Sequence, residues 1–382
     1  MRPPFQAPHT YRFFLLISLV SLGIIGCSSN LSSALNPSLA QIQLPPGFKI
    51  SIYADNLPGA RSLVLSPNGT LFVSTRDVGS VYAVRDTDGD GETDKKWIIA
   101  EGLTMPNGVA LKDGNLYVAE VSRVLRYDDV ENHLGDPPAP VVVSTAFPTA
   151  HAHGWKFIAF GPDGKLYVPV GAPGNNVLED DPLYAAIWRM DADGGNLELF
   201  ASGVRNTVGF AWDPATGDLW FTDNGRDGLG DDIPSDELNY APVKGLHFGY
   251  PYLHSKEVVD PVYGKMTPPK AITLPKYELG AHVAALGMRF YTGSMFPAKY
   301  RGGIFIAEHG SWNRSKKVGY RVVFIKVEGD KAVSQEVFAS GWLDSSQESV
   351  SGRPVDVLVM PDGALLVSDD KAGVVYRVEW ER

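Results

Sequence analysis

Hydrophobic and polar residues alternate along this chain in short runs that recur as six similar segments. Each segment has a turn, usually with Asp-Gly or Pro-Asp-Gly character, then a short alternating strand, a loop and a second strand. Such turns followed by apolar positions at every second residue are typical of β-hairpins. The first strands of the segments start at Leu71, Leu116, Leu166, Leu219, Ile304 and Leu365. No long stretch has helical periodicity, so the pattern predicts an all-β protein.

The spacing of these strands predicts a β-propeller. The first three intervals between strand starts are 45, 50 and 53 residues, close to the period of a four-stranded propeller blade. We therefore expect a six-bladed β-propeller with four-stranded antiparallel blades over residues 42–382. The segment 47–57 is expected to join the last blade as a strand and close the ring. A pair of β-sandwiches is the alternative, which the regular repeat disfavours.

The last two intervals between strand starts, of 85 and 61 residues, are longer than one blade requires. They predict insertions after the fourth and the fifth units, on one face of the propeller. Long connecting loops carry binding and catalytic residues more often than the strands that they join. We therefore expect the functional site on the face with the insertions.

The N-terminus is expected to be a targeting segment outside the fold. Arg2 and Arg12 precede an apolar run at 13–25, which is short for a membrane span. The run ends in Ile24-Ile25-Gly26-Cys27, which resembles a bacterial lipobox. An ordinary signal peptide followed by a chance cysteine is the alternative.

Cys27 is the only cysteine of the chain, as suits an oxidising compartment in which it has no partner to pair with. We expect residues 1–26 to be a lipoprotein signal peptide and Cys27 to be acylated. Residues 27–41, mostly small and polar, are then a flexible tether that anchors the protein to a bacterial membrane by its lipid. The expected location is the periplasm or another extracytoplasmic space.

The charge balance of the chain limits the kinds of molecule that it is expected to bind. The chain has 34 Lys and Arg against 44 Asp and Glu, a formal net charge of −10 at pH 7. Nucleic-acid binding needs clustered Lys and Arg, so we expect no nucleic-acid partner. An acidic protein of this kind is suited to a medium that contains cations such as calcium.

One acidic loop has the spacing of a calcium-binding loop. Asp86, Asp88, Asp90 and Asp94 follow one another at intervals that let several carboxylates bend around one hard cation. Trp97 stands where an EF-hand requires glutamate, so the loop is not an EF-hand. A single structural Ca²⁺ and a solvated acidic turn both remain open.

Polar and cationic residues gather at strand ends of the last three units. Arg205 and Asn206 precede a strand of the fourth unit, and the loop 221–240 is rich in glycine and carboxylates. In the fifth and sixth units the residues of this kind are His309, Asn313, Arg314, Lys316 and Arg353. Around a propeller channel they suit an anionic ligand, because guanidinium groups bind carboxylates in pairs of hydrogen bonds. Ordinary surface charge is the alternative for each of them.

His151 and His153 lie two residues apart in "TAHAHGWKF", so on a strand they would face the same side. A metal pair, a catalytic base beside a spectator, and two satisfied core histidines are the three interpretations of these residues. The spacing alone does not choose between them.

The order of several motifs resembles the sorbosone dehydrogenase and soluble glucose dehydrogenase group of quinoprotein sugar dehydrogenases. The motifs are "LPPGFKISIYA", "MPNGVAL", "HGWKFIAFGPDGKLYVPVG", "FASGVRN", "DELNYAPVKGLHFGYP", "HGSWNRS" and "SGRPVDV", and the likeness extends from about residue 42 to 380. The fold of that group is a six-bladed propeller, in agreement with the repeat. The resemblance implies oxidation of a sugar hydroxyl or aldehyde by pyrroloquinoline quinone (PQQ), which is held together with Ca²⁺.

The resemblance also implies roles for single residues. His153 matches the family's general base, which takes the hydroxyl proton while hydride passes to the quinone, and His151 has no counterpart. Arg205 matches the arginine that polarises a quinone oxygen, and Asn206 matches a residue that hydrogen-bonds the cofactor. Arg353 matches an arginine for a cofactor carboxylate. The backbone carbonyls that bind the cofactor's calcium match Gly225 and Arg226.

The chain departs from the glucose enzymes at four places. Ala152 stands where they have an aspartate beside the base, and Pro106-Asn107 replaces Gln-Asn, which leaves Asn107 as a cofactor ligand. Val355 replaces the second arginine of the last blade. Their cofactor lysine has three possible substitutes here, His309, Arg314 and Lys316. Glucose is therefore not the substrate that we expect.

The leading interpretation is a lipid-anchored sugar dehydrogenase of the aldose or sorbosone type that uses PQQ and passes electrons to a membrane quinone or cytochrome. No Gly-x-Gly-x-x-Gly opens a helix after a strand, so no nicotinamide cofactor is expected. A calcium-dependent sugar lactonase and a non-catalytic propeller that binds carbohydrate or a partner are the alternatives.

Overall fold

The strands that the repeat predicts are the second strands of six blades and are the most buried strands of the protein. They are β3 (Leu71–Ser74), β7 (Asn115–Ala119), β11 (Leu166–Val170), β15 (Leu219–Asp223), β22 (Ile304–Glu308) and β28 (Leu365–Asp369). The six leucine and isoleucine side chains that mark their starts are at most 1% exposed. Because these strands pack between neighbouring blades, both of their faces are buried, and each such side chain contributes about 1.5–3 kcal/mol to folding.

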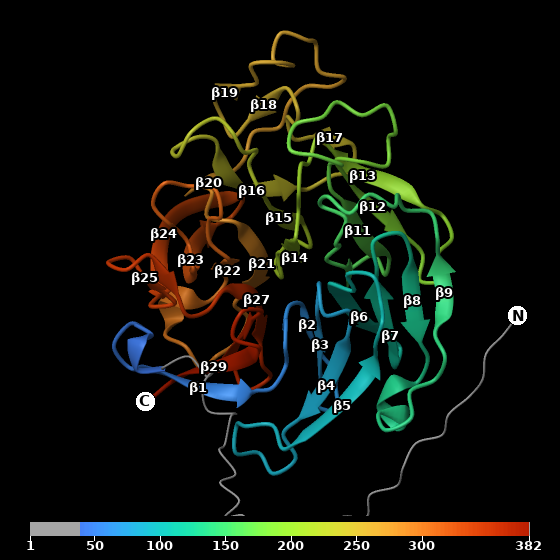
Figure 1. Cartoon of the computed structure of the whole chain (residues 1–382), viewed down its shortest axis with the longest axis vertical. Coiled ribbons are helices and arrows are strands. Elements are labelled where there is room, and N and C mark those ends of the chain that lie inside the picture. The colour runs from blue at the N-terminus through green and yellow to red at the C-terminus, as the bar shows by residue number, and fades with distance from the viewer. Residues whose placement is uncertain (1–38, 382) are drawn as a thin grey trace, which may run out of the picture. The chain divides into compact units, whose positions relative to one another are not determined.

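The computed structural model describes residues 39–381, and six antiparallel sheets are arranged in a ring in this range (Figure 1). Blade one consists of β2 (Leu63–Leu65), β3, β4 (Val81–Arg85) and β5 (Lys95–Ala100). Blade two consists of β6 (Gly108–Lys112), β7, β8 (Val124–Tyr127) and β9 (Val141–Ser144). Blade three contains β10 (Ala159–Phe160), β11, β12 (Ala186–Met190) and β13 (Glu198–Ser202).

The second half of the ring is built in the same way. Blade four consists of β14 (Gly209–Trp212), β15, β16 (Ser235–Ala241) and β20 (Tyr277–Ala281). Blade five consists of β21 (Ala285–Phe290), β22, β23 (Arg321–Glu328) and β24 (Lys331–Ala339). Blade six consists of β27 (Pro354–Val359), β28, β29 (Val374–Trp380) and β1 (Phe48–Ala54). The predicted six-bladed β-propeller is therefore confirmed.

Blade six is made from both ends of the described chain. β1 pairs antiparallel with β29, from Phe48 opposite Trp380 to Ala54 opposite Val375. The ring of Phe48 lies edge-on to the rings of Phe296, at 4.7 Å, and Trp380, at 4.8 Å. The prediction that segment 47–57 supplies a closing strand is thus confirmed.

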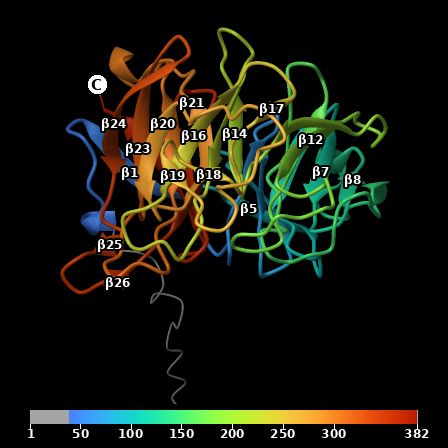
Figure 2. The same cartoon turned by 90° about the horizontal axis from the view of Figure 1, so that it is seen from above.

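The insertion of blade four differs from the expectation in its position. It lies between the third and fourth strands of that blade, β16 and β20, and not after the blade. Its first strand, β17 (Leu246–His247), pairs parallel with β13 and gives blade three a fifth strand. Its other two strands, β18 (Leu253–His254) and β19 (Val258–Val259), form a short hairpin. The second insertion, with β25 (Leu343–Asp344) and β26 (Ser349–Val350), lies between blades five and six as expected (Figure 2).

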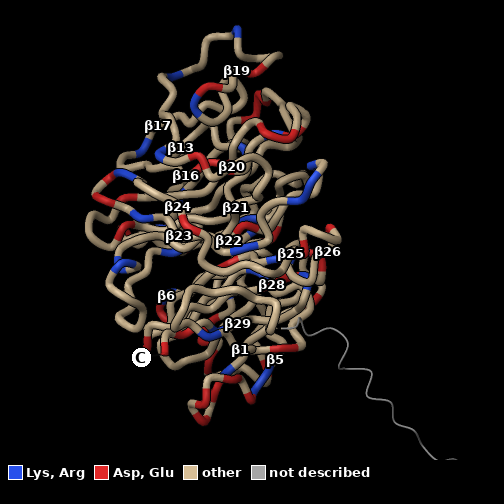
Figure 3. Tube along the Cα trace, turned by 90° about the vertical axis from the view of Figure 1, so that its left-hand side faces the viewer, with Lys and Arg blue, Asp and Glu red and all other residues tan. Residues whose placement is uncertain are grey.

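The remaining regular elements are three 3-10 helices, η1 (Leu39–Gln41), η2 (Val130–His133) and η3 (Ala298–Tyr300). In the part of the chain that the structure describes, no helix has the length and apolar character needed to cross a membrane. The predicted signal peptide, Cys27 and most of the predicted tether lie outside the described residues. Basic and acidic positions are interspersed over most of the trace in Figure 3.

Candidate active site

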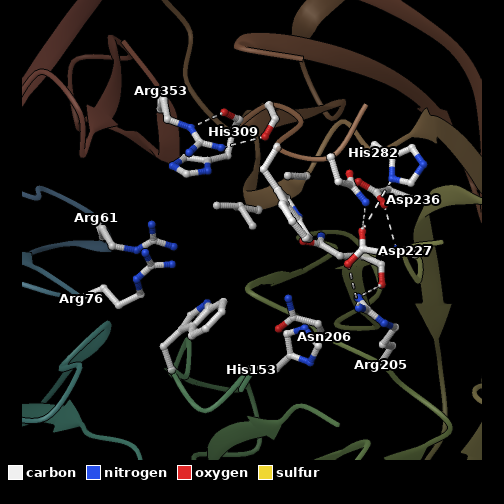
Figure 4. Close-up of a pocket in the computed structure, with 18 residues that line it drawn as sticks. Arg61, Arg76, His153, Arg205, Asn206, Asp227, Asp236, His282, His309 and Arg353 are labelled. Atoms are coloured by element: carbon white, nitrogen blue, oxygen red, sulfur yellow. Dashed lines mark hydrogen bonds and ion pairs between the residues drawn. The ribbon is translucent and has the colours of Figure 1, made fainter. Parts of the chain in front are cut away.

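A cavity of about 330 Å³ lies where the loops of five blades converge. Its walls come from the loops that enter blades one, three, four, five and six, and from the loops between the second and third strands of blades one, four and five. Since blade-entry loops and these hairpin loops lie at the same end of a propeller, residues far apart in sequence meet here (Figure 4). The volume is within the range of cofactor and small-molecule sites.

His153 enters this cavity from the loop before β10. Its backbone has a φ of 48°, and its Nδ1 lies 2.8 Å from the carbonyl oxygen of Ala172. A carbonyl can only accept, so Nδ1 carries the proton and Nε2 keeps its lone pair. Gly171 allows this approach, because a Cβ there would lie 2.5 Å from the Cβ of His153.

Burial lowers the pKa of His153 to about 4, with a further contribution from the positive charge of Arg205. The imidazole is therefore neutral at pH 7 and can accept a proton at Nε2. His151 is exposed and does not line the cavity. The two histidines accordingly do not act as a pair.

Arg205 and Asn206 line the cavity beside His153 and are both 5% exposed. The guanidinium of Arg205 donates to the backbone and side-chain oxygens of Asn175, at 2.8 and 3.0 Å, and to the carbonyl of Asn224, at 3.1 Å. The carboxylate of Asp223 accepts the backbone N–H groups of both Arg205, at 2.7 Å, and Asn206, at 2.5 Å. These contacts hold the pair rigidly at the entry to blade four.

Three buried carboxyl groups lie near Arg205, and one of them, Asp236, lines the cavity. Burial raises the pKa of Asp236 to about 6. Asp223 and Glu237 face each other on β15 and β16, and burial raises the pKa of both carboxyl groups. Repulsion between these two neighbouring carboxylates adds to the effect of burial on the pKa of Glu237.

The opposite side of the cavity is cationic. Arg61 and Arg76 lie there, and Arg353 and His309 form the adjoining edge (Figure 4). Arg61 donates to Asp370 at 2.6 Å, and Nε2 of His309 lies 2.9 Å from the same carboxylate. Burial alone would raise the pKa of Asp370, but its contacts with His309 and Arg61 hold it well below its usual range. Since burial lowers the pKa of His309 to about 4, Arg61 supplies the positive charge at neutral pH.

Arg353 is fixed by the backbone of the loop after β22. It donates to the carbonyl oxygens of His309, at 3.1 Å, and Gly310, at 2.8 Å. Its guanidinium also lies 5.4 Å from the centre of the Tyr320 ring. The three predicted cofactor-binding residues Asn206, His309 and Arg353 are thus brought together with His153 and Arg205 in one cavity.

Two predicted cofactor-binding residues do not line this cavity. Asn107 is fully buried behind Arg61, whose Nε donates to its side-chain oxygen at 2.5 Å. Arg314 turns outward and donates to the carbonyl of Asp231, at 2.9 Å, and the carboxylate of Asp232, at 2.7 Å. Lys316 is exposed outside the cavity, so of the three possible substitutes for the family's lysine only His309 faces the cavity.

Of the two residues whose carbonyls are predicted to bind calcium, Gly225 lines the cavity and Arg226 does not. The backbone N–H of Gly225 donates to Asp236 at 2.8 Å. Among the described residues, none donates a hydrogen bond to the carbonyl oxygen of Gly225 or Arg226. The side chain of Arg226 is directed to the carboxylate of Asp260, at 2.5 Å.

The predicted second calcium loop is a separate feature of the β4–β5 turn in blade one. Carboxylate oxygens of Asp86, Asp88 and Asp94 come within 4.8 Å of one another, whereas Asp90 is not part of this group. None of the four lines the cavity. Calcium binding at this loop stays a prediction.

Sequence reasoning missed several residues of the cavity. They are Arg61, Arg76, Trp155, Asp227, Asp236, His282 and Trp312. A signal for Arg61 exists, because "GARS", "GVRN" and "SGRP" each place an arginine just before the first strand of a blade. Loop residues such as Asp227 and His282 belong to no repeat, so their convergence could not be read from the sequence.

Comparisons with known proteins agree with this picture of the fold. A family model described as "Domain of unknown function (DUF7133)" matches residues 35–381. An uncharacterized protein of Borreliella burgdorferi is 32% identical over 384 residues, 97% of this chain and 98% of that protein. The Escherichia coli protein named aldose sugar dehydrogenase YliI is 26% identical over 195 residues, 48% of this chain and 44% of that protein.

Two solved structures share the six-bladed fold at low identity. The holo PQQ domain of pyranose dehydrogenase from Coprinopsis cinerea has a TM-score of 0.74 and 18% identity, covering 88% of this chain and 97% of that one. The calcium structure of a Trichoderma reesei carbohydrate-active enzyme of family AA12 has a TM-score of 0.75 and 19% identity, covering 92% and 99%. At this identity they show the fold alone.

Proposed function

The chain belongs to the family described as "Domain of unknown function (DUF7133)", and from that premise we propose that it is a PQQ-dependent sugar dehydrogenase of the aldose or sorbosone type. One observation carries the proposal. The neutral imidazole of His153 has its Nε2 free in a cavity that also contains Arg205 and a cationic wall. A general base, an electrophilic arginine and an anion-binding surface are what this reaction requires.

The donor groups of the cavity fit the cofactor. PQQ is a flat quinone with three carboxylates, and Arg61, Arg76 and Arg353 face the cavity with guanidinium groups that bind carboxylates. Burial of Arg61 and the backbone contacts of Arg353 fix these groups before a ligand arrives, which lowers the entropy cost of binding. Of the three possible substitutes for the family's lysine, we propose His309, because it lines the cavity.

The protein's own residues would act on the sugar as follows. Nε2 of His153 accepts the proton of the sugar hydroxyl, or of a hydrated aldehyde, as the C–H bond breaks. The carbonyl of Ala172 holds the ring in the required tautomer. The guanidinium of Arg205 would stabilise the negative charge that develops on an oxygen atom of the hydride acceptor. When bound, PQQ supplies the hydride acceptor.

Calcium is the second proposed cofactor. The carbonyl oxygens of Gly225 and Arg226 are hard oxygen ligands without other partners among the described residues. Asp236, which accepts the N–H of Gly225, holds this loop in place. We further propose an extracytoplasmic, lipid-anchored protein that passes electrons to a membrane quinone or cytochrome.

A calcium-dependent lactonase is not favoured. That chemistry needs acidic ligands that converge on a metal in the channel. Among the described residues, the one group of three such ligands is Asp86, Asp88 and Asp94, which lies outside the cavity.

Reconstitution of the purified protein with PQQ and Ca²⁺, followed by a dye-reduction assay over a panel of sugars, tests the proposal. We expect turnover of at least one sugar, and loss of about 10²–10⁴-fold in kcat for His153→Ala. His151→Ala is the matched control and should retain activity, because that histidine lies outside the cavity. Failure of every sugar and aldehyde to reduce the dye, or full activity of His153→Ala, would refute the proposal.

A further inference from the structure

Trp312 is the most exposed large hydrophobic residue among those that the structure describes, at 78%. It lies in the loop between β22 and β23 and lines the cavity beside Asn313. An indole left in water at a cavity wall loses the stabilisation that burial would bring. A flat apolar ligand surface that covers this ring would recover it.

Asn313 and Asp227 form a hydrogen-bonded pair next to this indole. Nδ2 of Asn313 donates to Oδ1 of Asp227 at 2.5 Å. This bond fixes the amide orientation, so Oδ1 of Asn313 is an acceptor, and it is buried without a hydrogen-bond partner among the described residues. Because that oxygen is buried inside the protein, the part of the pair that a ligand in the cavity can reach is the carboxylate of Asp227, which Asn313 holds in place.

Asp227 is held in a fixed position relative to Arg205. Its N–H donates to Oδ1 of Asn175 at 2.7 Å, and Nδ2 of Asn175 donates to its carbonyl oxygen at 2.9 Å. The same Asn175 accepts two hydrogen bonds from the guanidinium of Arg205. Oδ2 of Asp227 lies 3.8 Å from that guanidinium. Groups bound at Asp227 would therefore lie at a defined distance from the reacting end of the cavity.

The two ends of the cavity differ in the partners that they can accept. Arg61 and Arg76 supply only hydrogen-bond donors, and Asp227 lies on the opposite side (Figure 4). A ligand carboxylate is attracted to the end that contains Arg61 and Arg76, and it is repelled by the end that contains Asp227. Sugar hydroxyls can donate to the carboxylate of Asp227, and a sugar ring has an apolar C–H face that fits an indole.

We infer that Trp312 and Asp227, the latter held in place by Asn313, form the subsite that binds the sugar ring and selects it, with the indole against its C–H face and the carboxylate on its hydroxyls. This inference rests on the proposed function. The carboxylate of Asp227 makes the subsite selective for neutral pyranoses over sugar acids.

The test measures sugar binding and cofactor binding separately. Glucose, galactose, fucose and glucuronate are each titrated into the protein by calorimetry, with and without PQQ and Ca²⁺, and PQQ affinity is measured by thermal shift. We expect Trp312→Ala and Asp227→Asn to weaken binding of the neutral sugars about tenfold or more, as loss of one good contact does. Trp312→Phe should restore most of the affinity. PQQ affinity should change by less than about twofold, well below the roughly tenfold loss that we expect for sugar affinity.

Val262→Ala is the matched control, because Val262 is 65% exposed and outside the cavity. The inference is wrong if the wild-type protein binds none of the sugars, if the variants bind them as wild type does, or if they lose PQQ affinity instead. If wild type binds a sugar through Trp312 but PQQ and Ca²⁺ support no dye reduction, the subsite stands and the proposed function fails.

Discussion

At the scale of single residues, a backbone group sets the orientation and the tautomer of the His153 imidazole. Here the carbonyl of Ala172 accepts the hydrogen bond from Nδ1 of His153 and selects the tautomer. A neutral acceptor raises the pKa of an imidazole less than a carboxylate would, so burial dominates and the histidine stays neutral.

This arrangement predicts the pH dependence of the reaction. The pKa of His153 is lowered to about 4, so the base is unprotonated above that pH and becomes protonated as the pH falls through it. We expect kcat/KM for the reconstituted enzyme to stay constant from pH 7 to about 5 and to decline below. A pH–rate profile in dye reduction measures this. A decline of kcat/KM that begins at pH 6.5 or above as the pH falls would contradict the buried environment assigned to His153.

Lys156 is a second buried residue whose contacts reach the base. It is 1% exposed, burial lowers its pKa to about 7, and its ammonium donates to the carbonyl oxygens of Gly154, at 2.8 Å, and Val121. Gly154 follows His153 directly. We expect Lys156→Met to cost about 1–3 kcal/mol of unfolding free energy, because two buried carbonyls lose their donor. It should also lower kcat while PQQ affinity is unchanged.

Urea denaturation and steady-state kinetics measure the two effects. Lys165→Met is the matched control, since Lys165 pairs with Asp191 at the surface and should contribute at most about 1 kcal/mol. Equal effects of the two substitutions on kcat would show that Lys156 does not position the base.

At the scale of elements, the strands were more predictable than the loops. The six buried second strands have a strong apolar signal and a turn before them, so their starts were placed to within one residue. The insertion of blade four was misplaced, because strands of two residues such as β17 and β18 carry no periodicity. The parallel pairing of β17 with β13 depends on tertiary packing, which local pattern does not contain.

The candidate site was predictable in part, for the same reason. Arg205, Asn206 and Arg353 stand in the loops just before first strands, so the repeat brings them to one end of the propeller. Asn107 also precedes a first strand, but its side chain turns behind Arg61. Whether a loop side chain points into the cavity depends on its rotamer and neighbours, and the sequence does not specify these.

The closing strand makes a testable contribution to stability. Phe48 packs edge-on against four aromatic rings, with centroid distances of 4.7 to 5.5 Å. We expect Phe48→Ala to lower the free energy of unfolding by about 3 kcal/mol, since it removes a large side chain from an aromatic cluster. Val141→Ala, at an exposed position of β9, should change it by less than about 0.5 kcal/mol. Denaturation curves that coincide for the two variants would contradict the role of β1 in closure.

The acidic turn between β4 and β5 gives a prediction at the same scale. If Asp86, Asp88 and Asp94 bind Ca²⁺, calcium raises the melting temperature of the protein without PQQ, and Asp86→Asn removes part of that rise. Asp90→Asn should leave the calcium-dependent rise in melting temperature unchanged, because Asp90 is not one of the three carboxylates that lie close together. A calcium response that survives Asp86→Asn unchanged places the ion elsewhere.

At the scale of the whole molecule, the propeller unites residues that are remote in sequence. Arg61 and Asp370 are 309 positions apart, yet their side chains meet at 2.6 Å beside the cavity, because blade six brings the C-terminal strands next to blade one. The closed ring therefore has a functional consequence besides stability. It joins the arginines of blades one and six to His153 of blade three and Arg205 of blade four.

The central claim is that His153 acts as the base when a sugar is oxidised by bound PQQ. Stopped-flow absorbance of the PQQ- and Ca²⁺-loaded protein, mixed with sugar in the absence of oxygen and dye, follows reduction of the bound cofactor in a single turnover. We expect rapid reduction in the wild type, and reduction about 10²–10⁴-fold slower in His153→Ala with the cofactor still bound. Equal rates in the two proteins, or no sugar-dependent change in the wild type, would contradict the claim.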